Sequence, residues 1–215
     1  MNQSTQNKPR PRRERKDNAD KRRLQLIDAT LRSIVANGLA KTTLATVANE
    51  AGLSQGVAVF YFKTKDGLLA ETLRTQYSRY QDNWMRELNE ANSDPASRLI
   101  ALIRADFAPA VCNPETLSIW FAFWGELRFQ PHYAEISREF DQKRGAAIQE
   151  ICAELMPGAS EAEVEMTATS IDSLTDGLWQ KLYIWPETLD LDSALDVTIR
   201  TVQKLLPGHT AGLVR

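Results

Sequence analysis

The feature that most constrains the fold of this sequence is a helical spacing of apolar residues that continues along almost the whole chain. From residue 20 onward, apolar side chains recur three or four positions apart, which places them on one face of an α-helix. No segment alternates strictly between apolar and polar residues, and the Asp66-Gly67 pair lies inside a helical pattern rather than between strands. The fold class is therefore predicted to be all-α.

Helix start and stop signals divide this pattern into about nine helices. Asp94 and Asn113 are each followed by proline, a combination typical of an N-cap and the first helical position. Ser160 and Glu163 have the spacing of a capping box. The expected helices cover residues 20–37, 42–51, 54–62, 64–90, 131–155, 160–185 and 191–206, and two more begin at Pro95 and Pro114.

Charge is divided unevenly between the two parts of the chain. Residues 1–65 carry 13 Lys and Arg against 5 Asp and Glu, a net charge of +8, whereas residues 66–215 carry a net charge of −10. A basic N-terminal part favours a polyanionic partner for that part alone, although a solvated run of charges would have the same composition. Residues 1–19 contain too few apolar side chains to bury a core, so they are predicted to form a disordered basic arm.

Residues 42–62 have the pattern of a helix-turn-helix. Two short amphipathic segments are joined by a tight turn in which Gly52 suits a left-handed conformation and Ser54 is placed to cap the second helix. In this motif the second helix enters the major groove of DNA, although a basic three-helix packing unit would have similar spacing. The expected organisation is a basic arm over residues 1–19, a helix-turn-helix domain over 20–66, a helical ligand-binding and dimerisation domain over 67–208 and a tail over 209–215.

The same segment resembles the N-terminal domain of the tetracycline-repressor (TetR) family of transcriptional regulators. The matching residues are Thr43, Val47, Ala48, Ala51, Gly52, Leu53, Ser54, Gly56, Tyr61, Phe62, Lys65, Asp66, Gly67, Leu68 and Leu69. The chain departs from the pattern at Val59, where many family members have an aromatic residue.

The resemblance implies binding to a double-stranded DNA operator. Thr43 and the backbone amides around Ser54 would bind phosphates, as would Tyr61 and Lys65. Gln55 suits the edge of an adenine, and Val57 suits a thymine methyl group. The predicted DNA-binding residues are Arg22, Arg23, Thr42, Thr43, Ser54, Gln55, Gly56, Val57, Phe60, Tyr61 and Lys65. A core position for Tyr61 and an idle surface position for Gln55 are the alternatives.

Aromatic residues and carboxylates share faces of two later helices. The predicted ligand-binding residues are Trp120, Phe123 and Trp124 on one helix and Asp172, Asp176, Trp179 and Tyr183 on the helix over 160–185. Aromatic faces beside a carboxylate suit a cation, and above all a quaternary ammonium group. A stripe of core aromatics is the alternative interpretation of the same spacing.

Small residues form a stripe on the helix over 160–185. Ser170, Ser173 and Gly177 recur at helical spacing and would allow a partner helix to approach closely. Together with the helix over 191–206, this stripe predicts a four-helix interface in a homodimer, which would place two DNA-binding domains one helical turn apart on DNA. Packing within one chain is the alternative.

Several segments also resemble the choline-responsive repressors of the glycine-betaine pathway within the TetR family. They are Lys21-Arg22-Arg23 with Leu26–Leu31, Trp120-Phe121-Ala122-Phe123-Trp124, Gln130-Pro131 and Asp176-Gly177-Leu178-Trp179. This resemblance implies a repressor that leaves DNA when choline or a related amine binds. The segment Tyr183–Pro186 and the long basic arm depart from that subgroup, so another hydrophobic or cationic effector stays open as an alternative.

Other classes of protein have little support in the sequence. The chain has only two histidines and no nucleophile-elbow, zinc-protease or phosphate-loop motif, so an enzyme, a metal site and a cofactor are not predicted. An architectural DNA-binding protein without an effector is a further alternative. Cys112 and Cys152 are expected to be buried, reduced thiols of a cytoplasmic protein. Neither a signal peptide nor a membrane helix is predicted, because the longest aromatic-apolar stretch, Ile119–Trp124, is far shorter than the ~20 residues that span a bilayer.

Overall fold

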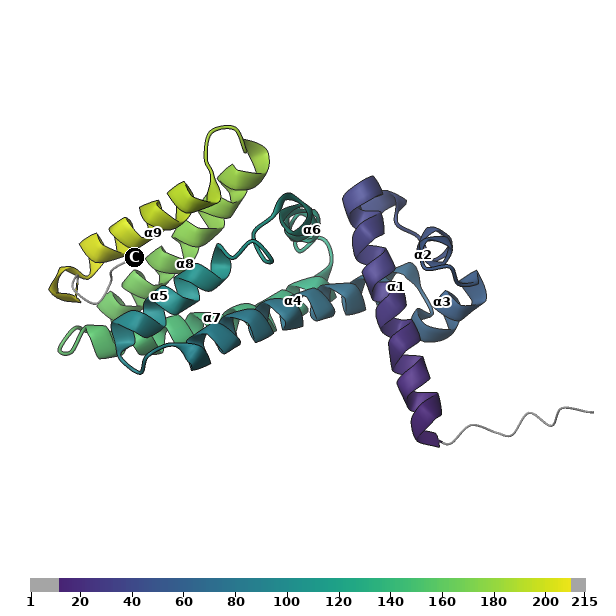
Figure 1. Cartoon of the computed structure of the whole chain (residues 1–215), viewed down its shortest axis with the longest axis horizontal. Coiled ribbons are helices and arrows are strands. Elements are labelled where there is room, and N and C mark those ends of the chain that lie inside the picture. The colour runs from purple at the N-terminus through teal and green to yellow at the C-terminus, as the bar shows by residue number, and fades with distance from the viewer. Residues whose placement is uncertain (1–11, 210–215) are drawn as a thin grey trace, which may run out of the picture. The chain divides into compact units, whose positions relative to one another are not determined.

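Helices account for every regular element in residues 12–209, the part of the chain that the computed structural model describes (Figure 1). The nine α-helices are α1 (Arg12–Lys41), α2 (Leu44–Glu50), α3 (Gln55–Phe62), α4 (Lys65–Glu90), α5 (Pro95–Asp106), α6 (Pro114–Trp124), α7 (Pro131–Leu155), α8 (Glu161–Ile184) and α9 (Leu191–Leu205). A short 3-10 turn follows at Pro207–His209. The predicted all-α fold class is confirmed, and most of the predicted helix limits lie within a few residues of the observed ones.

The first helix is longer than the sequence pattern predicts. α1 begins at Arg12 instead of residue 20, so the expected disordered arm is helical from that residue on. Residues 12–23 are mainly Arg, Lys, Asp and Glu, and the long charged side chains have high helix propensity even without an apolar face. At its other end, Gly38 has a φ of 77°, so the helical backbone is interrupted near the predicted stop. The rest of the predicted arm, residues 1–11, and the tail residues 210–215 lie outside the described residues.

The chain divides into two compact units between Thr72 and Leu73, inside α4. We call the part up to Thr72 the head unit and the part from Leu73 the body unit. The observed division lies beyond the predicted boundary at residue 66 because the start of α4 contributes Leu68 to the core of the head unit. The other buried members of that core are Leu26, Ile27 and Ala29 of α1, Val47, Ala48 and Ala51 at α2, and Ala58 and Phe62 of α3.

The turn between α2 and α3 has the predicted geometry. Gly52 adopts a φ of 63°, the left-handed conformation that side chains with a Cβ rarely adopt. The amide of Leu53 then donates a hydrogen bond to the carbonyl oxygen of Ala48. This turn allows α2 and α3 to pack against each other and against α1, which gives the head unit the helix-turn-helix arrangement.

The body unit is a bundle in which α7 and α8 form the most extensive helix pair. Its fully buried side chains include Leu99, Leu102, Ile103, Trp120, Phe123, Ile148, Ile151 and Ile171. Cys112 and Cys152 are buried free thiols, as predicted, and burial raises their pKa to about 12 and about 11. Neither thiol is therefore a thiolate near neutral pH.

Side-chain caps fix the starts of the body helices, and this is why their limits could be predicted. The side chains of Asp94, Asn113 and Asp190 each accept a hydrogen bond from the backbone amide three residues later. Ser160 and Glu163 form the predicted capping box, with both reciprocal bonds present. Each cap satisfies an amide that the helix itself leaves without an acceptor.

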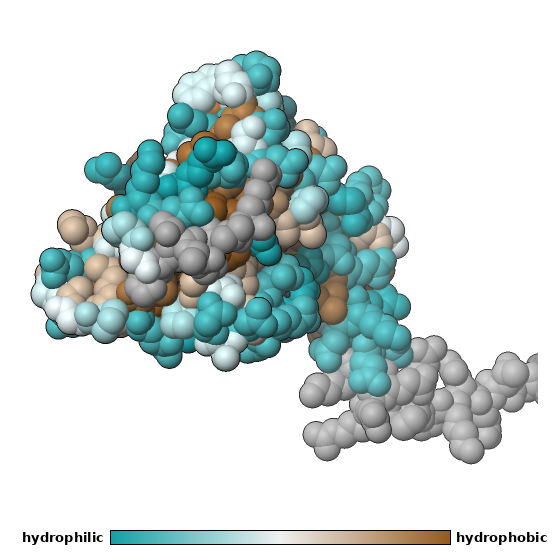
Figure 2. Space-filling model, turned by 60° about the vertical axis from the view of Figure 1, so that its left-hand side comes forward, coloured by the Kyte–Doolittle hydropathy of each residue, from teal (hydrophilic) through white to brown (hydrophobic). Residues whose placement is uncertain are grey.

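The outer surface in Figure 2 is mainly hydrophilic and is interrupted by smaller hydrophobic areas. Among the described helices, none combines the length and the apolar composition that a bilayer-spanning segment needs.

Candidate functional site

The outer face of α3 is the surface of the head unit that is free to contact another molecule. Gln55, Gly56, Val59 and Phe60 are exposed on this helix, and 68% of the Phe60 surface is accessible. Val57 is the exception among the predicted groove-facing residues, because it is half-buried and packs against the core of the head unit. The prediction for Val57 is therefore wrong in this structure, and Val59 occupies the outer face instead.

The start of α3 differs from the predicted cap. Ser54 occupies the N-cap position with extended backbone, but its side chain makes no capping hydrogen bond. The predicted cap by the Ser54 hydroxyl is therefore wrong. Its cause is that the turn presents the backbone correctly without bringing the hydroxyl to an amide, which leaves an exposed helix N-terminus of the kind that binds phosphate groups.

The two threonines before α2 have different roles. Thr43 is exposed and caps α2, because its Oγ1 accepts from the Thr46 amide at 3.1 Å and the Thr46 Oγ1 accepts from the Thr43 amide at 2.8 Å. Thr42 is completely buried, and its hydroxyl donates to the carbonyl oxygen of Gly38 at 2.9 Å and contacts the hydroxyl of Ser33. The prediction that Thr42 contacts DNA is therefore wrong; it closes the turn after α1.

Lys65 lies at the first position of α4 and contacts the end of α1. Its Nζ donates hydrogen bonds to the carbonyl oxygens of Leu39 and Ala40, both at 2.8 Å. These carbonyls belong to the last turn of α1, where the helix dipole favours a positive charge. Tyr61, the other predicted phosphate ligand, is half-buried at the edge of the core.

Basic residues around α3 include one that the sequence pattern did not single out. Arg22 and Arg23 are exposed on α1, and Arg23 forms a 2.7 Å ion pair with Glu71. Lys63, directly after α3, has a φ of 65°, donates to the carbonyl oxygen of Phe60 and lies 5.3 Å from the centre of the Phe60 ring. This left-handed position is set by the end of α3, a feature that residue identity alone did not indicate.

The body unit contains a cavity of about 320 Å³ bounded by side chains of α4, α6, α7 and α8 and by Leu127 after α6. Its lining residues are Tyr77, Tyr80, Trp120, Trp124, Leu127, Ser137, Asp141, Arg144, Asp172, Asp176 and Trp179. We call it the aromatic pocket. Its volume is at the lower end of the range for small-molecule sites, so it suits a small ligand.

Five of the seven predicted ligand-binding residues line the aromatic pocket: Trp120, Trp124, Asp172, Asp176 and Trp179. Phe123 does not, because it is completely buried and packs edge-on against Tyr133. Tyr183 does not either, because it stacks on Phe121 with ring centres 4.9 Å apart, one turn beyond the pocket. Sharing a helical face with the pocket residues was thus insufficient for these two positions.

The sequence pattern missed the contributions of α4 and α7. Tyr77 and Tyr80 lie three positions apart on α4, and Ser137, Asp141 and Arg144 recur at helical spacing on α7. Each group therefore forms one face of its helix. This periodicity was available in the sequence, but only packing shows that the two faces meet the tryptophans.

Aromatic rings make up one side of the aromatic pocket. The ring centre of Trp120 lies 6.2 Å from that of Trp124 and 6.4 Å from that of Trp179. Tyr77 and Tyr80 meet Trp120 edge-on, with centres 4.7 and 5.9 Å away. Such rings present negative π-faces to a ligand, which favours a cation.

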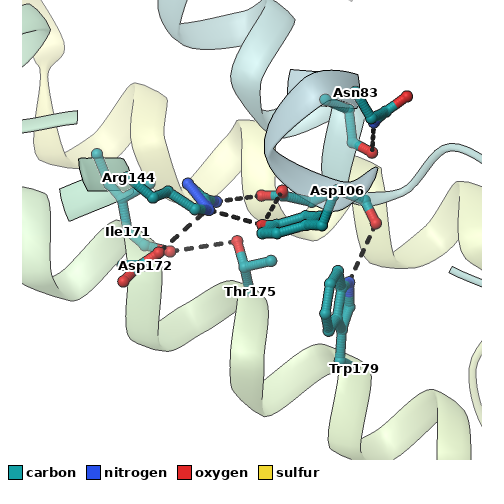
Figure 3. Close-up of polar contacts among 9 residues, drawn as sticks. Asn83, Asp106, Arg144, Ile171, Asp172, Thr175 and Trp179 are labelled. Carbon is teal, nitrogen blue, oxygen red and sulfur yellow. Dashed lines mark hydrogen bonds and ion pairs between the residues drawn. The ribbon is translucent and has the colours of Figure 1, made fainter. Parts of the chain in front are cut away.

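A buried ion pair lies beside these rings (Figure 3). The Arg144 guanidinium contacts the Asp106 carboxylate through Nη2 and donates from Nε to the Tyr80 hydroxyl oxygen at 2.7 Å. The Tyr80 hydroxyl in turn donates to Asp106 Oδ1 at 2.7 Å, and the Trp179 indole N–H donates to the Asp106 carbonyl oxygen at 3.1 Å. Although burial opposes the charge, the nearby carboxylates raise the pKa of Arg144 above its ordinary value, so Arg144 stays charged.

A second hydrogen-bond chain crosses the pocket from α6 to α7. The Trp124 indole N–H donates to the Tyr77 hydroxyl at 3.4 Å, and the Ser137 hydroxyl donates to Asp141 Oδ2 at 2.7 Å. Tyr77 and Ser137 are 2.7 Å apart, so the Tyr77 hydroxyl is the donor between them. Burial raises the pKa of Tyr77 to about 12, which keeps this hydroxyl protonated.

Negative charge exceeds positive charge around the aromatic pocket. Asp141, Asp172 and Asp176 line it, whereas Arg144 is the one cationic side chain among the described lining residues. Asp176 has exposed surface in the single chain, but neighbouring side chains desolvate its carboxyl group, and together with the charge of Asp172 they raise its pKa to about 7. An added cation would relieve this repulsion.

A larger groove of about 470 Å³, between the end of α7 and the start of α8, offers less chemistry. It has neither an aromatic nor a basic side chain among its described lining residues. The aromatic pocket is therefore the better candidate for a specific ligand.

The predicted dimer stripe lies on the surface of the body unit. Ser170, Ser173 and Gly177 are all exposed on α8, and Met166 on the same helix is 63% exposed. α9, which packs against α8, exposes Val197. Small residues beside exposed apolar ones leave a face of α8 and α9 without a partner inside the chain.

A helix-turn-helix head joined to a helical body with an aromatic pocket defines the class of DNA-binding transcriptional regulators. Residues 26–72 match the family model for bacterial regulatory proteins of the tetR family, and residues 95–207 match the model for the C-terminal domain of the BetI-type transcriptional repressor. The chain belongs to the TetR family and carries a BetI-type C-terminal domain. Regulators of this family are not enzymes; they bind operator DNA and are typically dimers.

Individual relatives agree with this assignment. The chain is 34% identical to the HTH-type transcriptional regulator BetI of Burkholderia mallei over 185 residues, which cover 86% of this chain and 93% of the relative. It is also 34% identical to BetI of Paraburkholderia xenovorans, covering 81% and 88% of the two chains.

Two solved structures share the fold. A transcriptional regulator from Pseudomonas aeruginosa PAO1 aligns with a TM-score of 0.80 at 24% identity, over 91% of this chain and 95% of that one. A regulator from Saccharomonospora viridis, solved in complex with choline, aligns with a TM-score of 0.77 at 19% identity, over 86% and 96% of the two chains.

Proposed function

We propose that the protein is a cytoplasmic, homodimeric repressor that leaves its DNA operator when choline or a related quaternary amine binds the aromatic pocket. The observation that carries this proposal is the combination of five aromatic rings with three carboxylates in one small cavity. Each ring face that meets a quaternary ammonium contributes about 0.5–2 kcal/mol. A neutral apolar ligand would gain nothing from the carboxylates.

The relatives support the same ligand class. The matching C-terminal domain is described as BetI-type, and the Saccharomonospora viridis regulator of the same fold was solved in complex with choline. The two resemblances rest on different parts of the comparison, one on sequence and one on fold.

The head unit supplies the proposed DNA contacts. Gln55, Gly56 and Phe60 on the exposed face of α3 are placed to contact base edges in the major groove. The exposed start of α3 at Ser54, the capped start of α2 at Thr43, and Tyr61 and Lys65 are proposed to bind phosphates, and Arg22 and Arg23 are basic residues that add electrostatic attraction to DNA. These contacts would fix the position of α3 on the duplex.

Release from DNA is proposed to follow from a shift between two conformations. α4 is one continuous helix that contributes Lys65 to the head unit and Tyr77 and Tyr80 to the aromatic pocket. A ligand that binds one position of α4 more tightly than another changes the population of the two. In a dimer, the two heads must lie ~34–36 Å apart to enter successive major grooves, so a modest shift abolishes the fit.

The first experiment is a tryptophan-fluorescence titration of the purified protein with choline and with its neutral carbon isostere, 3,3-dimethyl-1-butanol. We expect a saturable change with choline only, because the carboxylates and π-faces select a positive charge. A response to both compounds would favour a pocket for hydrophobic effectors. No response to either would remove quaternary amines from the proposal and leave the DNA-binding assignment intact.

Two leucine variants locate the response. Trp124→Leu removes a ring of the aromatic pocket, and we expect it to weaken choline binding measured by calorimetry. Trp185→Leu is the matched control, since Trp185 is exposed and lies outside the pocket. Equal weakening in both variants would contradict the proposed site. Release of DNA is then followed with a fluorescent duplex selected by the protein from a random pool.

A further inference from the structure

Two buried hydrogen-bond donors in the wall of the aromatic pocket have no acceptor. Among the described residues, Arg144 Nη1 and Trp120 Nε1 are shielded from solvent and make no hydrogen bond. The other indole N–H groups of the pocket are satisfied, because Trp124 donates to Tyr77 and Trp179 donates to the Asp106 carbonyl. The polarity that the pocket leaves unmatched is therefore of the donor type.

The Arg144 donor is held in a fixed position. Nε is bound to the Tyr80 hydroxyl, and Nη2 contacts Asp106 and lies 3.6 Å from Asp172 Oδ1. The guanidinium group is planar and rigid, so these contacts also fix the direction of the N–H groups of Nη1. Buried donors of this kind are normally matched by an acceptor, and a bound ligand is one source of it.

We infer that the effector carries, besides its ammonium group, a neutral oxygen that accepts a hydrogen bond from Nη1 of Arg144. This inference rests on the proposed function and specifies its ligand class. The π-faces and carboxylates would hold the ammonium group, and Arg144 would select the oxygen.

The charge around the pocket restricts the chemistry of that oxygen. A carboxylate on the ligand would approach Arg144, but it would also meet Asp141, Asp172 and Asp176, which already repel one another. A hydroxyl or carbonyl oxygen accepts the same hydrogen bond without this repulsion. The favoured class is therefore a hydroxylated or carbonyl-bearing quaternary ammonium ion, in preference to an alkyl ammonium ion or a zwitterion.

The test compares three probes on the full-length protein by calorimetry. Choline has the charge and the hydroxyl, propyltrimethylammonium replaces the hydroxyl by a methyl group, and glycine betaine replaces it by a carboxylate. We expect choline to bind about tenfold or more tightly than propyltrimethylammonium, which is the usual effect of a hydrogen bond to a charged group. We expect glycine betaine to bind more weakly than choline.

An arginine-to-lysine pair of variants assigns the effect to Arg144. Arg144→Lys keeps a cation beside Asp106, but its ammonium group is used by Asp106 and Tyr80, so the preference for choline over propyltrimethylammonium should fall towards one. Arg138→Lys makes the same change at an exposed position of the same helix outside the pocket and should keep the wild-type preference. Melting curves confirm that both variants are folded.

The outcomes separate this inference from the proposed function. Equal binding of choline and propyltrimethylammonium to the wild-type protein would overturn the oxygen acceptor and leave the cation site standing, and so would an unchanged preference in folded Arg144→Lys. The absence of binding by any of the three cations would overturn the proposed function itself, and the inference with it. If Arg144→Lys does not fold, the comparison on the wild-type protein still decides.

Discussion

The guanidinium of Arg144 and the carboxylate of Asp106 form an ion pair that is almost entirely shielded from solvent: only 8% and 0% of the two side chains are exposed. One partner lines the aromatic pocket, and the other holds the Tyr80 hydroxyl against it. The pair therefore links the stability of the body unit to the shape of the pocket.

Asp106→Asn should destabilise the protein strongly. The substitution leaves Arg144 charged and buried without its main counterion, and breaking a buried pair in this way costs about 3–5 kcal/mol of the free energy of unfolding. Urea denaturation followed by circular dichroism measures this loss. Glu139→Gln is the control, because it breaks an ion pair between Glu139 and Arg74 that is more than 40% exposed on both sides and should cost less than about 1 kcal/mol. Similar losses in both variants would show that the buried pair has no special role.

Choline binding should strengthen as the pH rises through about 7. The pKa of Asp176 is raised to about 7 by desolvation and by the charge of Asp172, with Arg144 opposing and Asp106 and Asp141 adding to the rise. A bound cation favours the ionised carboxylate, so binding at lower pH must displace a proton. For one coupled group this gives an affinity up to about tenfold higher at pH 8 than at pH 6. Calorimetry in buffers of different ionisation enthalpy measures both the affinity and the released proton.

Asp176→Asn separates this carboxylate from the rest of the pocket. The variant should bind choline with a flatter dependence on pH between 6 and 8. Its stability should change in the opposite sense: a carboxyl group whose pKa is raised on folding binds its proton more tightly in the native state, so the wild-type protein loses stability as the pH rises from about 4 to about 7. Asp176→Asn should therefore unfold at a higher temperature than the wild type at pH 8. An unchanged pH dependence of binding in this variant would assign the coupling to Asp141 or Asp172 instead.

Lys65→Ala should weaken binding to every DNA sequence alike and lower the salt dependence by about one counterion. The side chain bonds the end of α1 through Leu39 and Ala40, so the variant should also lose some stability, and binding must be measured well below its melting temperature. Fluorescence anisotropy at several salt concentrations gives the slope. An unchanged slope with reduced stability would mean that Lys65 serves only as a cap for α1.

Gln55→Ala should act differently from Lys65→Ala. Gln55 is exposed on the outer face of α3, so its loss should relax the preference at one base pair, by about 1–3 kcal/mol of discrimination, and leave the salt dependence unchanged. Duplexes with single base-pair substitutions measure this effect. A uniform loss on all duplexes would place Gln55 at the phosphate backbone instead.

The fold was largely predictable because local signals mark the helix ends. Asp94, Asn113 and Ser160 cap their helices through backbone amides three residues away, so each signal is complete within one turn of sequence. The start of α1 was missed for the converse reason. Helix propensity of charged residues extends it to Arg12 without an apolar pattern that could be recognised.

The aromatic pocket was only partly predictable because its members come from four helices that are distant in sequence. Trp120, Trp124 and Trp179 stood out as aromatic residues at helical spacing, whereas Arg144 resembled one more surface charge. Only the packing of α7 against α8 and α5 shows that Arg144 is buried against Asp106. The burial of Thr42 is similar, since its side chain and that of the exposed Thr43 carry the same hydroxyl and differ only in direction.

The exposed small-residue stripe on α8 predicts where a second copy of the chain binds. Adding a Cβ at Gly177 meets no atom within 4 Å in the single chain, and replacing a helical glycine generally stabilises the helix. Gly177→Lys should therefore fold but weaken a dimer in which two α8 helices lie close together, because a long charged side chain would be buried at the interface.

Analytical ultracentrifugation over a range of protein concentrations measures this effect, and we expect a shift of Gly177→Lys from dimer towards monomer. Gly145→Lys is the control, since Gly145 of α7 also has no atom within 4 Å of an added Cβ and lies outside the stripe. Loss of the dimer should weaken DNA binding as well, because each head alone contacts only one half-site. A Gly177→Lys variant that stays dimeric would place the interface away from this face of α8.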